Sequence, residues 1–202
     1  MTFWRTAIQS RRTRPALAAL AASSLLAITV SNDDLFVRRS LNDIHVVAPR
    51  LHFLTGKTLQ RLRDGATAPF DFQLTISAGS KNNVIARAVE RFVVSYDVWQ
   101  EKFAVIRMSD FHKWGMNASP NAAETWCVDN ISLPALKLPP GQDLWARLEI
   151  RSVDQKGQSS PVSDSGISII SLVELFSRPP RPQQDHWTLE TAAFHVDALK
   201  QQ

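Results

Sequence analysis

Three carboxylates lie around one short polar segment of this 202-residue chain. Asp97 and Glu101 flank the tripeptide Val-Trp-Gln, and Asp110 follows a little further on. Glycosidases use a pair of carboxylates about 5–10 Å apart in a cleft for acid–base catalysis. A hairpin turn can supply this spacing, but no neighbouring sequence predicts the cleft. Aspartate is also a preferred turn residue, so we assign no catalytic residue here.

The same segment contains Trp99, for which the sequence leaves two interpretations open. In the first, the ring folds back onto its own domain, over the side chain of Arg107, since tryptophan is usually largely buried. In the second, the ring protrudes from the turn. A protruding tryptophan is a common anchor for a protein partner. The sequence therefore predicts one candidate binding site, formed by Trp99, Asp97 and Glu101.

No other part of the sequence predicts a catalytic, metal or cofactor site. A structural zinc site needs closely spaced ligand pairs, and His45 and His52 are expected on opposite faces of one strand. The single cysteine, Cys127, excludes an intramolecular disulfide and a cysteine-based zinc site. Its place beside Trp126 on a predicted helix favours a small core residue. The sequence lacks the usual nucleophile-elbow, phosphate-loop and dinucleotide motifs. The remaining histidines are isolated: His112, His186 and His195.

Alternating apolar residues predict the strands that position the candidate site. The stretch 91–108 is a predicted β-hairpin with apolar groups on both faces, which favours a place inside a sheet. Segments 69–77 and 143–152 alternate in the same way, and 69–77 has one apolar and one polar face, as expected for core on one side and water on the other. The residues expected in one core are Phe72, Leu74, Phe92, Val94, Leu148 and Ile150.

Other segments carry weaker signals. Ser119-Pro120 predicts the start of a helix with Ala122, Ala123, Trp126, Cys127 and Asn130 on one side. Thr58–Arg63 predicts a helical turn that Gly65 ends. A strand is expected over 44–53, interrupted at Pro49, and an irregular stretch over 109–118. Segment 167–176 fits a helix or a strand, with helix preferred, and 187–199 fits a short strand or an amphipathic helix.

These elements predict a mainly β fold, an antiparallel β-sandwich-like domain with one or two short helices. We expect a signal peptide or membrane anchor over 1–31, a tether over 32–42, the β-rich domain over 43–177, and a proline-rich linker and tail over 178–202.

The N-terminus predicts membrane targeting. Arg5, Arg11, Arg12 and Arg14 precede an uncharged run from Pro15 to Asn32. This is the pattern of an export signal or a signal-anchor. The run is long for a signal core and short for a spanning helix, so cleaved and uncleaved forms remain open. In either case the arginines stay in the cytoplasm and the remaining chain crosses the membrane.

The charge of the remaining chain argues against nucleic-acid binding. Without those four arginines, the chain contains 19 basic and 19 acidic residues. A neutral body offers no basic surface for a polyanion.

The segment from Leu59 to Arg151 resembles a family of uncharacterised, exported bacterial envelope proteins, a domain of unknown function. The features that carry this resemblance are Leu59-Gln-Arg-Leu-Arg-Asp-Gly65, the strand around Phe70, Ser95-Tyr96-Asp97, Lys102-Phe-Ala-Val105 and the strand at 144–150. The resemblance implies a β-rich fold in the cell envelope. It implies no activity and no catalytic residue.

Together these observations predict a non-enzymatic envelope protein, either anchored in the inner membrane facing the periplasm or secreted to the periplasm, that binds a protein partner. The alternatives are a periplasmic carrier of a small molecule or lipid, and a hydrolase with an unrecognised site. A carrier should contain a large apolar pocket, and a hydrolase should contain polar side chains that converge in a cleft. A partner-binding domain should expose apolar side chains.

Overall fold

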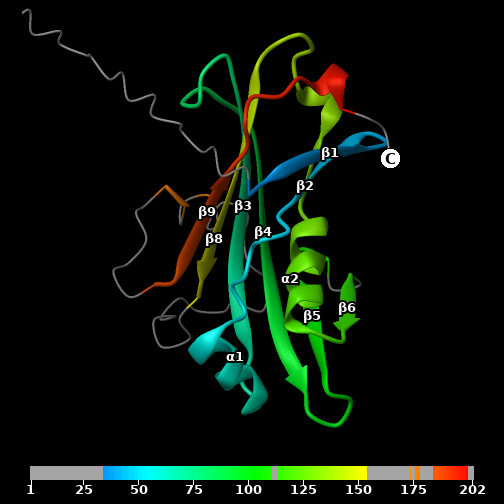
Figure 1. Ribbon diagram of the computed structural model, residues 1–202, viewed down its shortest axis with the longest axis vertical. Coiled ribbons are helices and arrows are strands. Elements are labelled where there is room, and N and C mark those ends of the chain that lie inside the picture. Colours follow the sequence, from blue (N-terminus) through cyan, green and yellow to red (C-terminus); the bar gives the residue numbers. More distant parts are fainter. Residues whose placement is uncertain (1–33, 111–112, 154–172, 174–175, 178–183, 200–202) are drawn as a thin grey trace, which may run out of the picture. The chain divides into compact units, whose positions relative to one another are not determined.

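The computed structural model describes residues 34–110, 113–153, 173, 176–177 and 184–199 (Figure 1). The predicted N-terminal signal or anchor, most of the ambiguous stretch 167–176 and most of the linker lie outside these residues.

The larger of two antiparallel sheets has six strands in the order β6-β5-β4-β3-β8-β9. The longest strands, β3 and β4, form its centre because their alternating sequences can pair over almost their whole length, from Ala68↔Val94 to Ser77↔Val84. The mainly β, antiparallel prediction is therefore confirmed. The strands are β3 (Ala68–Ala78), β4 (Val84–Asp97), β5 (Lys102–Arg107), β6 (Trp114–Asn117), β8 (Leu144–Ser152) and β9 (His186–Glu190).

The smaller sheet and one helix cover one face of the large sheet (Figure 1). This sheet has three strands, β1 (Phe36–Ser40), β2 (Asp43–Val47) and β7 (Ser132–Pro134), in the order β1-β2-β7. Helix α2 (Pro120–Asp129) lies beside β2, β5 and β6, while α1 (Gly56–Arg63) precedes β3. The short 3-10 helices η1 (Ala135–Lys137) and η3 (Val196–Ala198) follow β7 and β9.

One hydrophobic core lies between these layers. The rings of Phe53, Phe72 and Phe92 form a chain of edge-to-face contacts, with centroids 5.6 Å and 4.9 Å apart, a favoured geometry for aromatic pairs. Each of the six residues predicted for the core is fully buried. The small sheet contributes Ile44, Val46 and Leu133 to the same core, and α2 contributes Ala123, Cys127 and Val128.

The start of α2 and the end of α1 match the sequence predictions, whereas α1 begins at Gly56 and not at the predicted Thr58. The Ser119 hydroxyl caps α2 by accepting the Ala122 N–H at 3.2 Å, and Pro120 occupies the first turn. Such a cap satisfies one of the free N–H groups at a helix start. The chain leaves α1 through Gly65 at φ +87°, a conformation that favours glycine. The predicted buried side of α2 is partly wrong, because Ala122 is exposed while Glu124 and Val128 are buried.

The polar face of β3 is not in water, contrary to the prediction. Asp71, Gln73, Thr75 and Ser77 are all buried. Two arginines explain how a carboxylate can lie there: Arg91 and Arg151 occupy the neighbouring strands directly opposite Asp71. Burial of a charge is tolerated where it is paired.

Two segments predicted as a tether or as irregular contain strands, and the predicted tail contains the short strand that was one of its two alternatives. Part of the predicted tether forms β1, which Leu35 fixes by entering the core. The irregular stretch after Met108 contains β6, and β9 of the predicted tail completes the large sheet beside β8. The predicted strand over 44–53 ends at Val47, before Pro49. The β-rich body therefore includes residues on both sides of the predicted 43–177.

Candidate partner-binding hairpin

The turn between β4 and β5 projects from one end of the large sheet, at the same end as α1 (Figure 1). The two strands pair from Phe92↔Arg107 to Asp97↔Lys102, which leaves residues 98–101 as the turn. Tyr96 and Phe103 face each other just before it, with ring centroids 4.9 Å apart. This cross-strand aromatic pair stiffens the base of the turn.

The side chain of Asp97 organises the turn itself. Its Oδ1 accepts the backbone N–H groups of Trp99 at 2.9 Å and Gln100 at 3.0 Å. This local hydrogen bonding is typical of aspartate in turns. Glu101 then takes a left-handed conformation with φ 53°, which returns the chain to β5. Asp97 and Glu101 therefore shape the turn that presents Trp99.

Trp99 is 93% exposed. This exposure contradicts the interpretation that the ring folds back onto its own domain over Arg107. The Arg107 guanidinium pairs with Glu90 at 3.3 Å and donates to the Asn130 carbonyl. The neighbouring Val98 is also exposed. Two adjacent apolar side chains are thus exposed to solvent at the end of a hydrogen-bonded hairpin.

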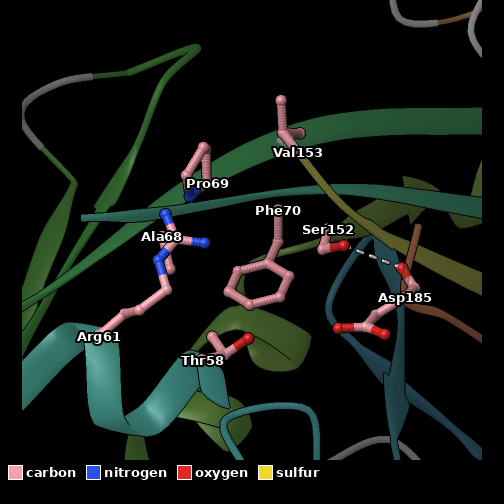
Figure 2. Close-up of a pocket in the computed structure, with 8 residues that line it drawn as sticks. All are labelled: Thr58, Arg61, Ala68, Pro69, Phe70, Ser152, Val153 and Asp185. Carbon is pink, nitrogen blue, oxygen red and sulfur yellow. Dashed lines mark hydrogen bonds between the residues drawn. The ribbon is translucent and has the colours of Figure 1, made fainter. Parts of the chain in front are cut away.

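The described part of the structure forms a small pocket elsewhere, between α1 and the ends of β3 and β8 (Figure 2). The ring of Phe70 lies at its centre, Arg61 extends from α1 along one side toward Ala68, and the Ser152 hydroxyl donates to the Asp185 carbonyl at 3.2 Å. Its volume is about 50 Å³. That is room for a few water molecules, whereas ligand pockets commonly measure about 300–1,000 Å³.

Glu124 is a buried polar residue that sequence reasoning missed. Its Oε1 accepts the backbone N–H groups of Phe53 and Leu54, each at 2.6 Å, and its Oε2 lies 3.1 Å from His52 Nδ1. The carboxylate therefore fastens the segment after β2 to α2. Its position next to Ala123, at the helical spacing of the buried residues, is the one sequence signal that could have indicated burial.

A second polar cluster lies on the face of the large sheet opposite the core. Both carboxylate oxygens of Asp71 accept from the Arg91 guanidinium, while Arg151 pairs with Glu149 at 2.5 Å. Burial raises the pKa of Asp71, although the hydrogen bond and charge of Arg91 and the charge of Arg151 act in the opposite direction. Opposite charges pair fully within this cluster, which gives it a structural role.

Three of the described histidines, His45, His52 and His195, make structural contacts. His45 Nδ1 lies 3.1 Å from the Asp129 carbonyl, and His195 pairs with Asp143 at 3.0 Å. His52 lies beyond the end of β2, so it does not share a strand with His45. No group of three metal-ligating side chains occurs among the described residues. Cys127 is buried as predicted, and burial together with the charge of Glu124 raises the pKa of its thiol well above the ordinary value.

Within the ranges that the structure describes, no helix has the length and apolar character of a membrane span. Comparison with known proteins finds no matching family model, no similar curated protein and no similar solved structure. The resemblance to exported bacterial proteins therefore remains a prediction.

Proposed function

We propose that this chain is a non-enzymatic protein of the bacterial cell envelope whose β-rich body binds a protein partner through the tip of the β4–β5 hairpin. The observation that carries the proposal is the 93% exposure of Trp99 at an ordered turn. Burial of a tryptophan against a partner contributes a large favourable free energy to binding, and tryptophan is enriched among the residues that dominate binding.

The rigidity of the hairpin supports this use of Trp99. The Asp97 hydrogen bonds and the Tyr96–Phe103 pair hold the turn before any partner arrives. A preformed site pays less conformational entropy on binding than a mobile loop. Glu101 and Asp97 add negative charge beside the apolar tip, so the partner we propose has an apolar pocket with basic residues at its rim.

The N-terminal sequence supports the envelope location. Its four arginines and uncharged run are the features of a signal or anchor that delivers the body across the membrane. Alkaline phosphatase fused after Ser40 should be active in a bacterial host, because this enzyme folds into its active form outside the cytoplasm. An inactive fusion retained in the cytoplasm would contradict the envelope location.

A photo-reactive amino acid at position 99 tests the binding site directly. In the full-length chain expressed in its native membranes, cross-linking from position 99 should give one discrete adduct with another protein. Leu136 is the matched control, because it is 84% exposed in η1, away from the hairpin. The same adduct from both positions, or from neither, would contradict a site at the hairpin tip.

A further inference from the structure

We propose that two copies of this chain pair through strand β6, so that their six-stranded sheets join edge to edge. This inference concerns a different surface from the hairpin tip and does not depend on the proposed function. It rests on the backbone geometry of β6, on its side chains and on its contrast with the other strands that end the two sheets.

Three of the four edge strands of the two sheets carry features that hinder the addition of another strand. Strand β1 contains Arg38 and Arg39, β7 ends in Pro134, and β9 contains Glu190, which pairs with Lys81 at 2.8 Å. Charges and proline are common protections of sheet edges. Strand β6, with the sequence Trp-Gly-Met-Asn, has neither charge nor proline.

The backbone of β6 offers free hydrogen-bonding groups on its outer side. Arg107 N–H donates to the Lys113 carbonyl at 3.1 Å, and Gly115 lies opposite Val105 of β5. Because an antiparallel strand directs its N–H and C=O groups alternately to its two neighbours, Lys113, Gly115 and Asn117 bond to β5. Trp114 and Met116 therefore present their N–H and C=O groups to the outer edge.

These groups are self-complementary about a twofold axis at Gly115. If Gly115 of one copy faces Gly115 of a second, Trp114 lies directly opposite Met116 of the other chain. Each such pair exchanges two hydrogen bonds, so the symmetric arrangement forms about four. Gly115 has no side chain to obstruct the close approach at the centre, where opposing Cα atoms come within about 4.5 Å.

The side chains also match across this junction. Since Gly115 faces Trp126 of α2, Trp114 and Met116 point to the opposite face of the sheet. The indole of Trp114, 61% exposed in the single chain, would then contact the thioether of Met116, a favourable sulfur–aromatic pair. Lys113 would face Asn117, so no like charges meet. Ile106, exposed beside Trp114 in the register, extends the apolar surface.

Engineered disulfides test the pairing and its register together. Lys113 and Asn117 form a predicted non-hydrogen-bonded pair across the junction, whose Cβ atoms lie close enough for a disulfide. Full-length Lys113→Cys and Asn117→Cys chains, carrying different tags and co-expressed, should form a mixed disulfide dimer under mild oxidation. Each variant alone should not, because identical positions lie several residues apart. The buried Cys127 of the unmodified chain is the control.

A proline variant separates pairing from folding. Met116→Pro removes an N–H that the isolated chain does not use, so the melting temperature should stay unchanged. Two hydrogen bonds per dimer are lost, which should weaken self-association at least about fivefold in sedimentation experiments. The proposal is overturned if the co-expressed cysteine variants do not cross-link, if either cross-links equally well alone, or if they cross-link to a different protein instead. Unchanged self-association in Met116→Pro would also overturn it.

Discussion

The indole of Trp126 lies directly against the backbone of Gly115. A Cβ atom on Gly115 would come within 2.5 Å of the indole Nε1, closer than real side chains approach. Glycine is therefore required at this point of β6 because an aromatic ring from α2 occupies the space that a side chain would take. The contact joins the helix to the edge strand of the large sheet. Trp126 also packs against Phe92, with ring centroids 6.1 Å apart.

We expect Gly115→Ala to lower the free energy of unfolding by about 1–3 kcal/mol, the usual cost of overpacking. Urea denaturation of the purified chain measures this change. Met116→Ala is the matched control, because Met116 points away from α2 and should change stability by less. Equal stability of Gly115→Ala and the unmodified chain would show that Trp126 can move aside without cost.

Glu124 makes a second contact whose removal should be costly. Glu124→Ala leaves the buried N–H groups of Phe53 and Leu54 without their acceptor, and each unsatisfied group costs about 1–3 kcal/mol. We expect a total loss of about 2–5 kcal/mol in urea denaturation. Glu124→Gln keeps one oxygen acceptor and should lose less than half as much. Equal losses in both variants would instead indicate that the negative charge, rather than the acceptor geometry, stabilises this region.

The ion pair between Lys81 and Glu190 should give a small acid-sensitive contribution to stability. The hydrogen bond from Lys81 lowers the pKa of Glu190, with Arg147 acting in the same direction. A carboxyl whose folded pKa is depressed stabilises the fold above its unfolded pKa, near 4.5, and this contribution is lost as the pH falls through the folded value. Solvent exposure of both side chains keeps it small.

Nuclear magnetic resonance titration of Glu190 measures this effect at the residue itself. Lys81→Met should raise the pKa of Glu190 toward its ordinary value, whereas Lys137→Met, which removes a lysine from η1, should leave it unchanged. An unaltered Glu190 pKa in Lys81→Met would mean that Arg147 alone is responsible for the shift.

Local alternation was sufficient to predict the long strands. Phe72, Leu74, Phe92 and Val94 are buried because their strands present one apolar face, and this pattern is visible in the sequence. Strand β6 could not be predicted in the same way, because Gly115 interrupts the alternation and its close contact with Trp126 depends on a helix that follows in the chain. Likewise, Asp71 lies on a polar face of its strand, and the arginines directly opposite it on the two neighbouring strands explain how its carboxylate can be buried.

The sequence predicts where the candidate site lies, but it does not predict whether Trp99 is buried or exposed. The polar turn between two apolar strands predicts where Trp99 lies. Whether the ring is buried or exposed depends on what surrounds the turn, and general tendencies favour burial of tryptophan. The described structure answers this question, since Trp99 is 93% exposed.

The most direct test of the proposed function combines stability and partner capture for Trp99→Ala in the full-length chain. An exposed side chain contributes little to folding, so the free energy of unfolding should change by less than about 0.5 kcal/mol. Capture of the protein that cross-links from position 99 should fall at least about tenfold, the loss expected when a binding anchor is removed. Leu136→Ala should alter neither quantity. Unchanged stability together with unchanged capture would contradict the proposal that Trp99 is the anchor of a partner-binding hairpin.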